Sequence, residues 1–524
     1  MHCSPKQISY TERHRSAGVL IKAALLSLLA AGMLSFPAAS AVYAQPQGDT
    51  VDDQKHTPES VPIENRYASG NTLRVCAACD YKTLASAVTD ARAYDTILIA
   101  DGVYTESGLH IDRPLRIIGN PGTVLDGGER SEHIILVTAD DVIIQGLTIR
   151  NGGSSYIDDL SGIRVEYARN CVIRDNRILK TTYAIYLARS DDCLIENNEV
   201  SGDAQDEVSA GNGIHLWYVN NVTIRNNRLA HHRDGFYFEF ADDCRILNNH
   251  SAENIRYGMH FMFSHRNVFR NNTFLHNQTG VAIMYSRNLV VERNRFLRST
   301  GNAFYGMLLK EITDSDITGN SFEGNTIGIM VEGANRNRFH SNRFIYNGWA
   351  AQIYGNSHNN SFYRNEFISN HFDISTNSPR NSNVFKQNYW SDYTGYDLNR
   401  DGLGDIPFRP VRVFGFWISH YPTLSVLLHS PVIQFLEIAE RAFPVITPPS
   451  LQDNEPAMRP WQPVSQTERR QRQSGAFAIA TMDCNTIYAM RPPGVEESVR
   501  EVGKLFSHYH SNMRTFNSDS GVIP

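Results

Sequence analysis

Residues 257–297 read YGMHFMFSHRNVFRNNTFLHNQTGVAIMYSRNLVVERNRFL, and they hold nearly two copies of one repeat. In each copy a glycine begins an alternating apolar segment and an asparagine follows 14 residues later, as at Gly258 and Asn272. The asparagine recurs at intervals of 22 to 29 residues through the middle of the chain, at Asn176, Asn198, Asn227, Asn249, Asn272, Asn294, Asn320, Asn342, Asn365 and Asn388. A repeat of about 22 residues made of short apolar segments predicts a parallel β-helix, in which each repeat forms one coil stacked on the last.

Alternation around each asparagine indicates which side chains face inward, because a strand turns successive side chains to opposite faces. The position three residues before the asparagine is apolar throughout, at Ile173, Ile195, Ile224, Ile246, Phe269, Val291, Ile317, Phe339, Phe362 and Phe385. We therefore expect an all-β, right-handed parallel β-helix with about ten regular coils of 22–23 residues between residues 162 and 390. We expect each asparagine to adopt a left-handed turn conformation and its amide to bond to the asparagine of the next coil.

The first 44 residues have the pattern of a secretory signal peptide, with basic residues before an apolar stretch from 23 to 36. Cleavage is expected after Ala44 or Ala41, and an uncleaved signal anchor is the alternative. The pattern predicts an exported, periplasmic protein whose residues 45–74 form a flexible lead-in. A formal net charge of -6 argues against a nucleic-acid partner. The sequence has no GxxxxGK[ST] motif, so no P-loop nucleotide site is predicted.

Residues 75–161 are expected to form an N-terminal cap and irregular first coils. Thr83 to Ala91 predicts a short helix that covers the open end of the β-helix, since exposed strand edges invite pairing with other chains. Cys76 and Cys79 predict a local disulfide in an oxidising compartment, and a metal or redox CxxC is the alternative. Further along, three cysteines share one inward column and are expected to be buried free thiols: Cys171, Cys193 and Cys244.

Two features follow the coils in residues 391–460. The first is an Asp-rich loop with oxygen donors at positions 1, 3, 5 and 9 of a calcium loop, at Asp397, Asn399, Asp401 and Asp405. Gly402 occupies position 6, but Phe408 replaces the bidentate Glu at position 12. Calcium is therefore one interpretation of this loop, and an Asx-rich turn is the other.

The second feature is a helix predicted from Pro431 to Phe443, which Ser430 can cap. It is apolar on more than one face, so it could cap the solenoid or dock on a partner, through Phe435, Leu436 and Phe443. Residues 461–524 differ in composition and predict a solvated, flexible tail.

Longer connections indicate a binding face on one sheet. Insertions at 152–159, after Asn198 and after Asn294 all fall at the same corner of the coil, and such loops tend to mark the binding face of a solenoid. The outward residues of the adjoining sheet include His260 and Met262 on one strand, with Met284 one coil further on. Imidazole and thioether form a soft donor set suited to Cu(I). The alternative is an apolar patch that contacts a partner.

The same face also carries His215, Trp217, Tyr237 and Glu239, which we interpret as partner-binding residues. Aromatic and acidic side chains on a β-helix sheet also suit a polysaccharide lyase or epimerase, with His215, Tyr237 and His260 as the reacting groups. Hydrolysis would need a pair of carboxylates. The acidic pairs at 191–192 and 242–243 fall in a turn column and are interpreted as turn formers.

The chain resembles the NosD family, the periplasmic β-helix component of the nitrous oxide reductase maturation system. The resemblance rests on the coils, on the block NYWSDYTGYD at 388–397 with its continuation DGLGDIP at 401–407, and on LHSPVIQFLEIAERAFPVITPP at 428–449. It implies a non-enzymatic role in assembly of the copper–sulfur centre of that reductase. It also implies four partners: an ABC-type permease, through which alone the protein would contact the membrane, its ATPase, a copper-chaperone lipoprotein and the reductase.

Overall fold

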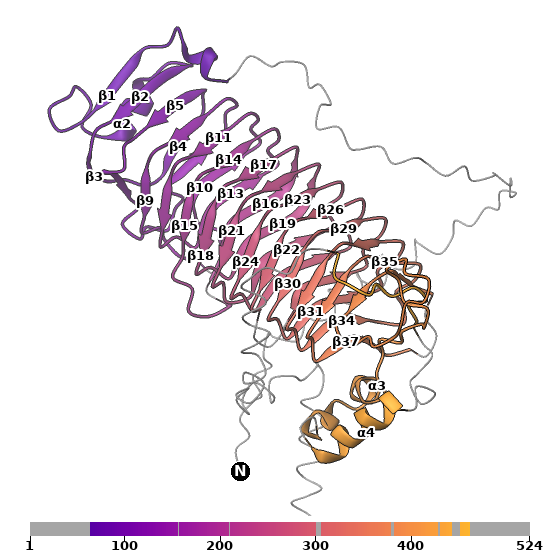
Figure 1. Ribbon diagram of the computed structural model, residues 1–524. Coiled ribbons are helices and arrows are strands. Elements are labelled where there is room, and N and C mark those ends of the chain that lie inside the picture. The colour runs from indigo at the N-terminus through magenta and orange to yellow at the C-terminus, as the bar shows by residue number, and fades with distance from the viewer. Residues whose placement is uncertain are drawn as a thin grey trace, which may run out of the picture. The chain divides into compact units, whose positions relative to one another are not determined.

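The computed structural model describes residues 63–155, 157–208, 210–299, 305–378, 382–427, 430–442 and 451–461. The predicted signal peptide, most of the lead-in and all but the first residue of the predicted tail lie outside these ranges. Nearly all of the described chain forms a solenoid of three parallel sheets (Figure 1). A regular coil contributes one strand to each of the three sheets.

The first sheet has 14 strands. They are β1 (Thr72–Val75), β2 (Asp95–Ile99), β5 (Leu115–Ile118), β8 (Ile143–Gln145), β11 (Val172–Arg174), β14 (Leu194–Glu196), β17 (Thr223–Arg225), β20 (Arg245–Leu247), β23 (Val268–Arg270), β26 (Val290–Glu292), β29 (Asp316–Thr318), β32 (Arg338–His340), β35 (Ser361–Tyr363) and β38 (Val384–Lys386).

The second sheet has 12 strands and carries the predicted binding face. They are β4 (Leu109–Ile111), β7 (Ile135–Val137), β10 (Ser161–Glu166), β13 (Tyr183–Ala188), β16 (Asn212–Asn220), β19 (Asp234–Asp242), β22 (Tyr257–Met262), β25 (Thr279–Met284), β28 (Tyr305–Lys310), β31 (Ile327–Glu332), β34 (Trp349–Ile353) and β37 (Phe372–Thr376).

The third sheet has 13 strands. They are β3 (Gly102–Thr105), β6 (Thr123–Asp126), β9 (Thr148–Arg150), β12 (Arg177–Leu179), β15 (Glu199–Ser201), β18 (Arg228–Ala230), β21 (His250–Ala252), β24 (Thr273–Leu275), β27 (Arg295–Leu297), β30 (Ser321–Glu323), β33 (Arg343–Ile345), β36 (Glu366–Ile368) and β39 (Tyr389–Trp390).

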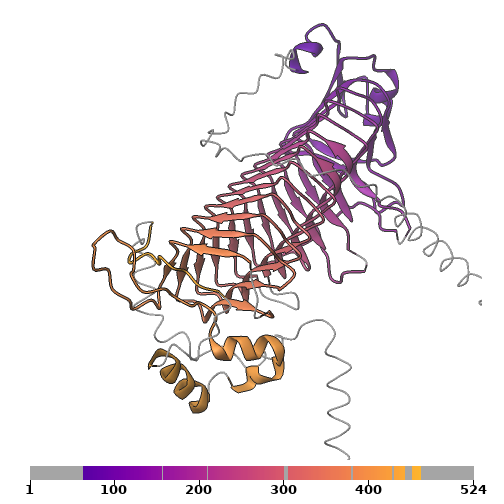
Figure 2. The same cartoon turned by 90° about the vertical axis from the view of Figure 1, so that its right-hand side faces the viewer.

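These sheets confirm the right-handed parallel β-helix, with about 13 turns in place of the ten regular coils expected. The count is higher because the irregular first coils pair with the regular ones (Figure 2). One strand, β1, begins within the last residues of the predicted lead-in.

The repeat asparagines form the predicted ladder inside the solenoid. The amide of Asn272 donates to Asn294 Oδ1 at 2.9 Å and to the Ile246 carbonyl at 2.8 Å, and its own oxygen accepts the backbone N–H of Asn249 at 2.9 Å. The predicted left-handed conformation was wrong by one residue, because Asn271 has a φ of 58° and Asn272 is not among the positive-φ residues. The ladder amide must point inward to reach the next coil, so the preceding residue makes the turn.

Aromatic rings fill the interior of the later coils. A continuous stack in the third sheet has ring centroids 4.2–5.5 Å apart, through Phe274, Phe296, Phe322, Phe344, Phe367 and Trp390. Each of these rings is almost fully buried. Stacked rings in register fix the position of each coil on the last, because neighbouring residues occupy the same column.

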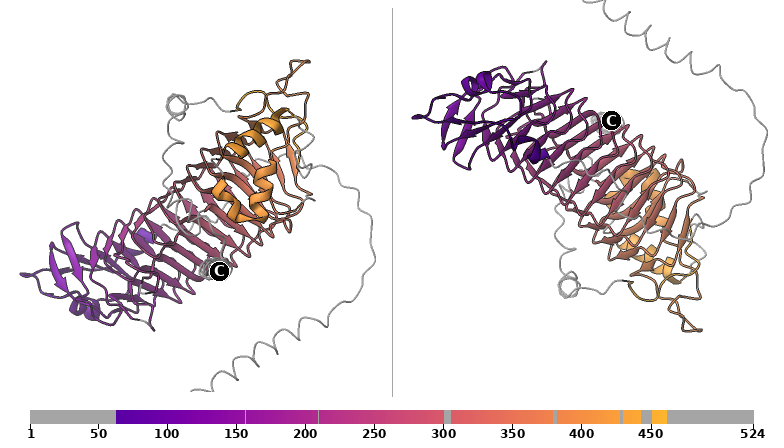
Figure 3. Two further views of the ribbon diagram at one scale, coloured as in Figure 1. Left: turned by 90° about the horizontal axis from the view of Figure 1, so that it is seen from below. Right: turned by 90° about the horizontal axis from the view of Figure 1, so that it is seen from above.

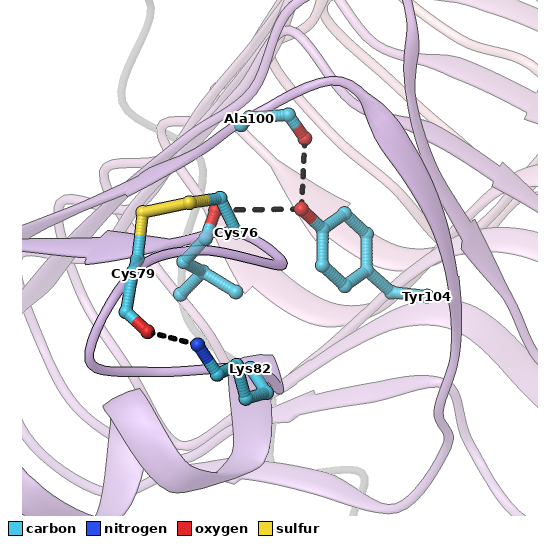
Figure 4. Close-up of a disulfide and its surroundings, with 6 residues drawn as sticks. Cys76, Cys79, Lys82, Ala100 and Tyr104 are labelled. Atoms are coloured by element: carbon cyan, nitrogen blue, oxygen red, sulfur yellow. Dashed lines mark hydrogen bonds between the residues drawn. A yellow bond between two sulfur atoms is a disulfide. The ribbon is translucent and has the colours of Figure 1, made fainter.

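The N-terminal end is capped as predicted. Helix α2 (Leu84–Asp90) begins after Thr83, whose side chain accepts the backbone N–H of Ser86, and η1 (Ile63–Tyr67) precedes β1. Cys76 and Cys79 form the expected disulfide beside α2 (Figure 4). The other three described cysteines are buried free thiols, also as expected, at Cys171, Cys193 and Cys244.

Segment 451–461 returns to the C-terminal end of the ladder, which the sequence did not predict. Among the described residues no later coil follows Asn388, and the carboxylate of Asp453 accepts its backbone N–H at 2.9 Å and its side-chain amide at 3.0 Å. Trp390 Nε1 donates to the same oxygen at 3.2 Å. Asp453 therefore takes the place that an asparagine would hold in one more coil.

Three helices lie beside the last coils (Figure 3). They are α3 (Val413–His420), η2 (Pro422–Leu427) and α4 (Pro431–Ala442), and α4 confirms the predicted helix except for Phe443, which is outside the described residues. Phe414 and Ile418 of α3 and Ile433 of α4 form one buried cluster with Trp349 and Phe372 of the solenoid. No helix in the described ranges is long and apolar enough to cross a membrane.

Candidate functional site

The second sheet presents the two outward columns that the sequence predicts. Strand pairing aligns His260 with Tyr237 and Ala282, and aligns Met262 directly with Met284. The three insertions all connect the third sheet to this sheet, since they follow β9, β15 and β27. The sequence therefore placed these side chains correctly relative to one another.

The first outward column is a stack of rings. His215 lies between Tyr186 and Tyr237, with centroids 4.1 and 4.6 Å away, and Tyr237 meets His260 at 5.0 Å. Burial lowers the pKa of His215 to about 3, so its ring is neutral at pH 7. His215 is only 8% exposed, and its contact with a partner stays a prediction. It points away from the core, but the rings of the adjacent coils cover it.

His260 has no hydrogen-bond partner in the described structure. Both ring nitrogens are buried, and the residue is 9% exposed. The nearest carboxylate oxygen belongs to Asp234, 3.9 Å from Nδ1, which is too long for a hydrogen bond. Burial lowers the pKa of His260 to about 4, so the imidazole is neutral at pH 7 and keeps a free lone pair.

Asp234 was missed by the sequence analysis although it is fully buried. Arg256 donates to its Oδ1 from Nε at 2.9 Å and to its Oδ2 from Nη2, and the backbone N–H of Tyr257 also donates to Oδ1, at 3.3 Å. This bidentate pair holds the carboxylate beside His260. Asp234 immediately precedes the glycine of its coil, and that position alone does not identify a buried carboxylate.

Met262 and Met284 are half-buried neighbours in the second outward column. Adjacent strands in a sheet lie about 4.8 Å apart, so both thioethers can reach one point between them. His260 is on the same face of the same strand as Met262. An unpartnered imidazole on the strand face that also carries Met262, with Met284 one coil further on, supplies the donor types that suit a soft monovalent metal ion. Within the described ranges no cluster of three or more His, Cys, Asp or Glu could hold a metal ion.

Trp217 and Glu239 are the other predicted partner-binding residues of this sheet, and both are half-exposed. The Arg189 guanidinium lies 5.2 Å from the Trp217 ring, and the Tyr237 hydroxyl donates to Glu239 at 3.5 Å. Burial raises the pKa of Tyr237 to about 12, so its phenol remains protonated at pH 7.

The acidic pairs are turn formers, as predicted. Asp192 and Asp243 have positive φ angles of 58° and 55°. Arg266 binds both Asp242 and Asp243. The second residue of each pair therefore lies at a left-handed turn position.

The Asp-rich loop has the internal bonds that both of its interpretations require. Asp397 accepts the backbone N–H groups of Asp401 and Gly402 at 3.2 and 2.9 Å, and Asp405 accepts that of Leu398 at 2.6 Å. Asn399 donates its side-chain amide to Asp401 at 3.0 Å. An empty Asx-rich turn and a calcium loop share such bonds, so calcium stays a prediction.

Helix α4 has two apolar faces with different environments. Ile433 and Leu436 pack toward α3 and the solenoid, whereas Val432, Phe435 and Ile438 are 72%, 72% and 63% exposed. The predicted contact residue Phe435 is thus free to meet a partner, and Leu436 instead serves the cap. The sequence left capping and docking as alternatives. The buried face agrees with capping, and docking through the exposed face stays a prediction.

These features define a parallel β-helix protein with aromatic, histidine and methionine side chains on the outward face of one sheet and an apolar helical face at its C-terminal end. The chain belongs to the NosD family, since the family model described as periplasmic copper-binding protein (NosD) matches residues 94–210 and 202–395. A relative from Pseudomonas aeruginosa is 34% identical over 375 residues, which cover 67% of this chain and 85% of the relative. One from Stutzerimonas stutzeri is 31% identical over 372 residues, covering 67% and 84%. Both are called probable ABC transporter binding protein NosD.

Solved structures of low sequence identity share parts of the solenoid. A family 28 exopolygalacturonase of Yersinia enterocolitica has a TM-score of 0.48 at 11% identity, covering 60% of this chain and 79% of that one. The adhesin PfbA of Streptococcus pneumoniae has a TM-score of 0.47 at 13% identity, covering 60% and 99%.

Proposed function

We propose that this chain is a periplasmic maturation factor that works with an ABC-type transporter in assembly of the copper–sulfur centre of nitrous oxide reductase. The role is non-enzymatic, and its partners are the permease and ATPase subunits, a copper-chaperone lipoprotein and the reductase. The description of the family as periplasmic and copper-binding supports the proposal, as do the names of the two relatives. The structural observation that carries it is the exposed apolar face of α4.

Contact with the transporter is assigned to α4. Its 12 residues span about 18 Å, which is shorter than the roughly 30 Å of a bilayer core, so we infer contact with a permease subunit rather than insertion. The buried face of α4 fixes the helix on the solenoid, and Glu440 accepts the backbone N–H of Val413 at 3.0 Å. The exposed face is therefore held in one orientation.

Replacing the exposed face of α4 is expected to abolish binding to the permease. Val432→Ser, Phe435→Ser and Ile438→Ser together remove three apolar side chains from one patch, and central contacts of this kind contribute about 2 kcal/mol or more each. Co-purification of the transporter with the tagged protein measures the effect. Val103→Ser with Val384→Ser, which alters exposed apolar residues of the solenoid, should leave co-purification intact. Normal co-purification of the α4 variant would contradict the assignment.

Copper(I) is proposed as transient cargo at His260, Met262 and Met284. Changing all three to Ala should lower the Cu(I) affinity by on the order of 100-fold, since even outer-shell changes at metal sites cost 10–100-fold. Competition with a chromophoric Cu(I) chelator measures it. Leu308→Ala is the matched control, because Leu308 lies in the His260 column two coils further on and has no donor atom. Equal affinities of the triple variant and the native chain would reject this site.

A further inference from the structure

Four aromatic side chains, three of them exposed and one half-exposed, form a column beside the thioethers. Tyr218, Phe240, Phe263 and Tyr285 come from four successive coils, and we call them the aromatic ridge. Their ring centroids are 4.4, 5.4 and 4.9 Å apart, with planes inclined by 20°, 13° and 10°. Tyr218, Phe263 and Tyr285 are 46%, 39% and 41% exposed. A continuous apolar strip of this kind on a protein surface marks a contact site more often than isolated apolar residues do.

The backbone of the ridge is in a conformation that disfavours aromatic residues. All four have positive φ angles, of 50°, 53°, 48° and 53°. Only Gly, Asn and Asp adopt this conformation readily, so each aromatic residue costs stability here. In other coils the same corner holds Tyr167, Arg189, Glu311 and Gly333, so most of these coils have no aromatic residue there. The fold therefore does not require aromatic residues at this corner, and their presence points to a contact outside the chain.

The stacking decides what kind of ligand the ridge suits. The two faces of each inner ring are covered by the neighbouring rings, and only the edge of the ring meets solvent. A sugar ring or a base stacks on an open aromatic face, which the inner rings do not offer. Protein interfaces are enriched in aromatic side chains and bury them irrespective of ring orientation. The ridge thus suits a protein surface better than a polysaccharide.

The position of the aromatic ridge indicates which kind of protein would bind it. Phe263 and Tyr285 directly follow Met262 and Met284 in the chain, so the ridge adjoins the proposed copper donors. In the coil after Tyr285 both columns become charged: Lys310 follows Met284 in the methionine column, and Glu311 follows Tyr285 in the ridge. At the other end Arg189 lies 5.2 Å from the Trp217 ring and 5.8 Å from the Tyr218 ring, and no carboxylate of the described residues pairs with it.

We propose that the aromatic ridge is the docking surface for the protein that exchanges Cu(I) with this chain. The partner would place its metal site opposite Met262 and Met284, cover the ring edges with apolar side chains and present a carboxylate to Arg189. This inference rests on the proposed function, because it names the partner of the same site. It adds a surface that binds the carrier without binding the metal.

The test uses Asn, which tolerates the left-handed conformation of these positions. Binding of the purified, Cu(I)-loaded soluble domain of the copper-chaperone lipoprotein is measured by titration calorimetry on the full mature chain. The variant Tyr218→Asn, Phe263→Asn, Tyr285→Asn should bind it at least 30-fold more weakly, with an unchanged or higher melting temperature and unchanged Cu(I) affinity. Arg189→Glu should weaken binding separately. The matched control is Glu311→Asn, at the same corner one coil further on, and it should bind normally.

The outcomes separate the two proposals. If the native chain binds the chaperone and the Asn variant binds it equally well, the ridge is not the docking surface, whereas the proposed function stands. If the native chain binds neither Cu(I) nor the chaperone, the proposed function fails and the ridge assignment fails with it. If the Asn variant changes the oligomeric state in sedimentation and leaves chaperone binding unchanged, the occupant is a second copy of this chain, which also overturns the proposal.

Discussion

Asn272→Ala is expected to lower the free energy of unfolding by about 4 kcal/mol, because it leaves several buried polar groups without partners. The Asn249 backbone N–H and side-chain amide lose their acceptor, at 2.9 and 3.1 Å, and the Ile246 carbonyl and Asn294 Oδ1 each lose a donor. No water can replace these bonds easily, since Asn272 is 0% exposed. Denaturant unfolding followed by circular dichroism measures the change.

The control for this prediction is the neighbouring residue. Asn271→Gly changes an exposed asparagine whose φ of 58° glycine adopts freely, and it should alter the free energy of unfolding by less than about 0.5 kcal/mol. If Asn272→Ala cost as little as Asn271→Gly, the ladder would not be a main source of stability.

Asp453→Ala is expected to release segment 451–461 from the last coil and to cost about 3–5 kcal/mol. It removes the acceptor for the Asn388 backbone and amide, for Trp390 Nε1 and for the Gln387 backbone N–H, at 2.9–3.2 Å. Hydrogen exchange should become faster in β38 and β39 while the coils of the ladder's middle stay protected.

The variant Asp453→Asn keeps a hydrogen-bond acceptor for the ladder and removes the negative charge of Asp453. An asparagine oxygen can accept the two bonds from Asn388, as the repeat asparagines from Asn198 to Asn388 do from the preceding asparagine, so this variant should cost only about 1 kcal/mol. Equal exchange rates in Asp453→Ala and the native chain would show that the returning segment does not close the ladder.

The fold was predictable because one residue type at one interval determines both strand register and core. The errors in the predicted fold have physical causes. The ladder asparagine was assigned to the turn because asparagine tolerates a left-handed backbone, whereas the need to reach the next coil places Asn271 there instead. Asp453 was missed because its role depends on a return of the chain from 65 residues beyond Asn388, which no local pattern encodes.

The candidate site was predictable in position but not in exposure. Register placed Met262 beside Met284 and His260, and the structure agrees. Burial of His215 depends on the rings of adjacent coils, and the buried pair of Asp234 with Arg256 depends on side-chain packing across coils. The ridge was missed because each of its residues falls in a turn, although their recurrence at the coil interval was a signal in the sequence.

The central claim is that this chain supports assembly of the copper–sulfur centre of nitrous oxide reductase. Its most direct test is the copper content and visible spectrum of the reductase purified from a strain that lacks this gene, with and without complementation. The account predicts a reductase that lacks the copper–sulfur centre and keeps its other copper, with the spectrum restored by the native gene. A fully loaded reductase from the deletion strain would contradict it, and activity of the chain on alginate or pectin would then be the next measurement, for a lyase or epimerase.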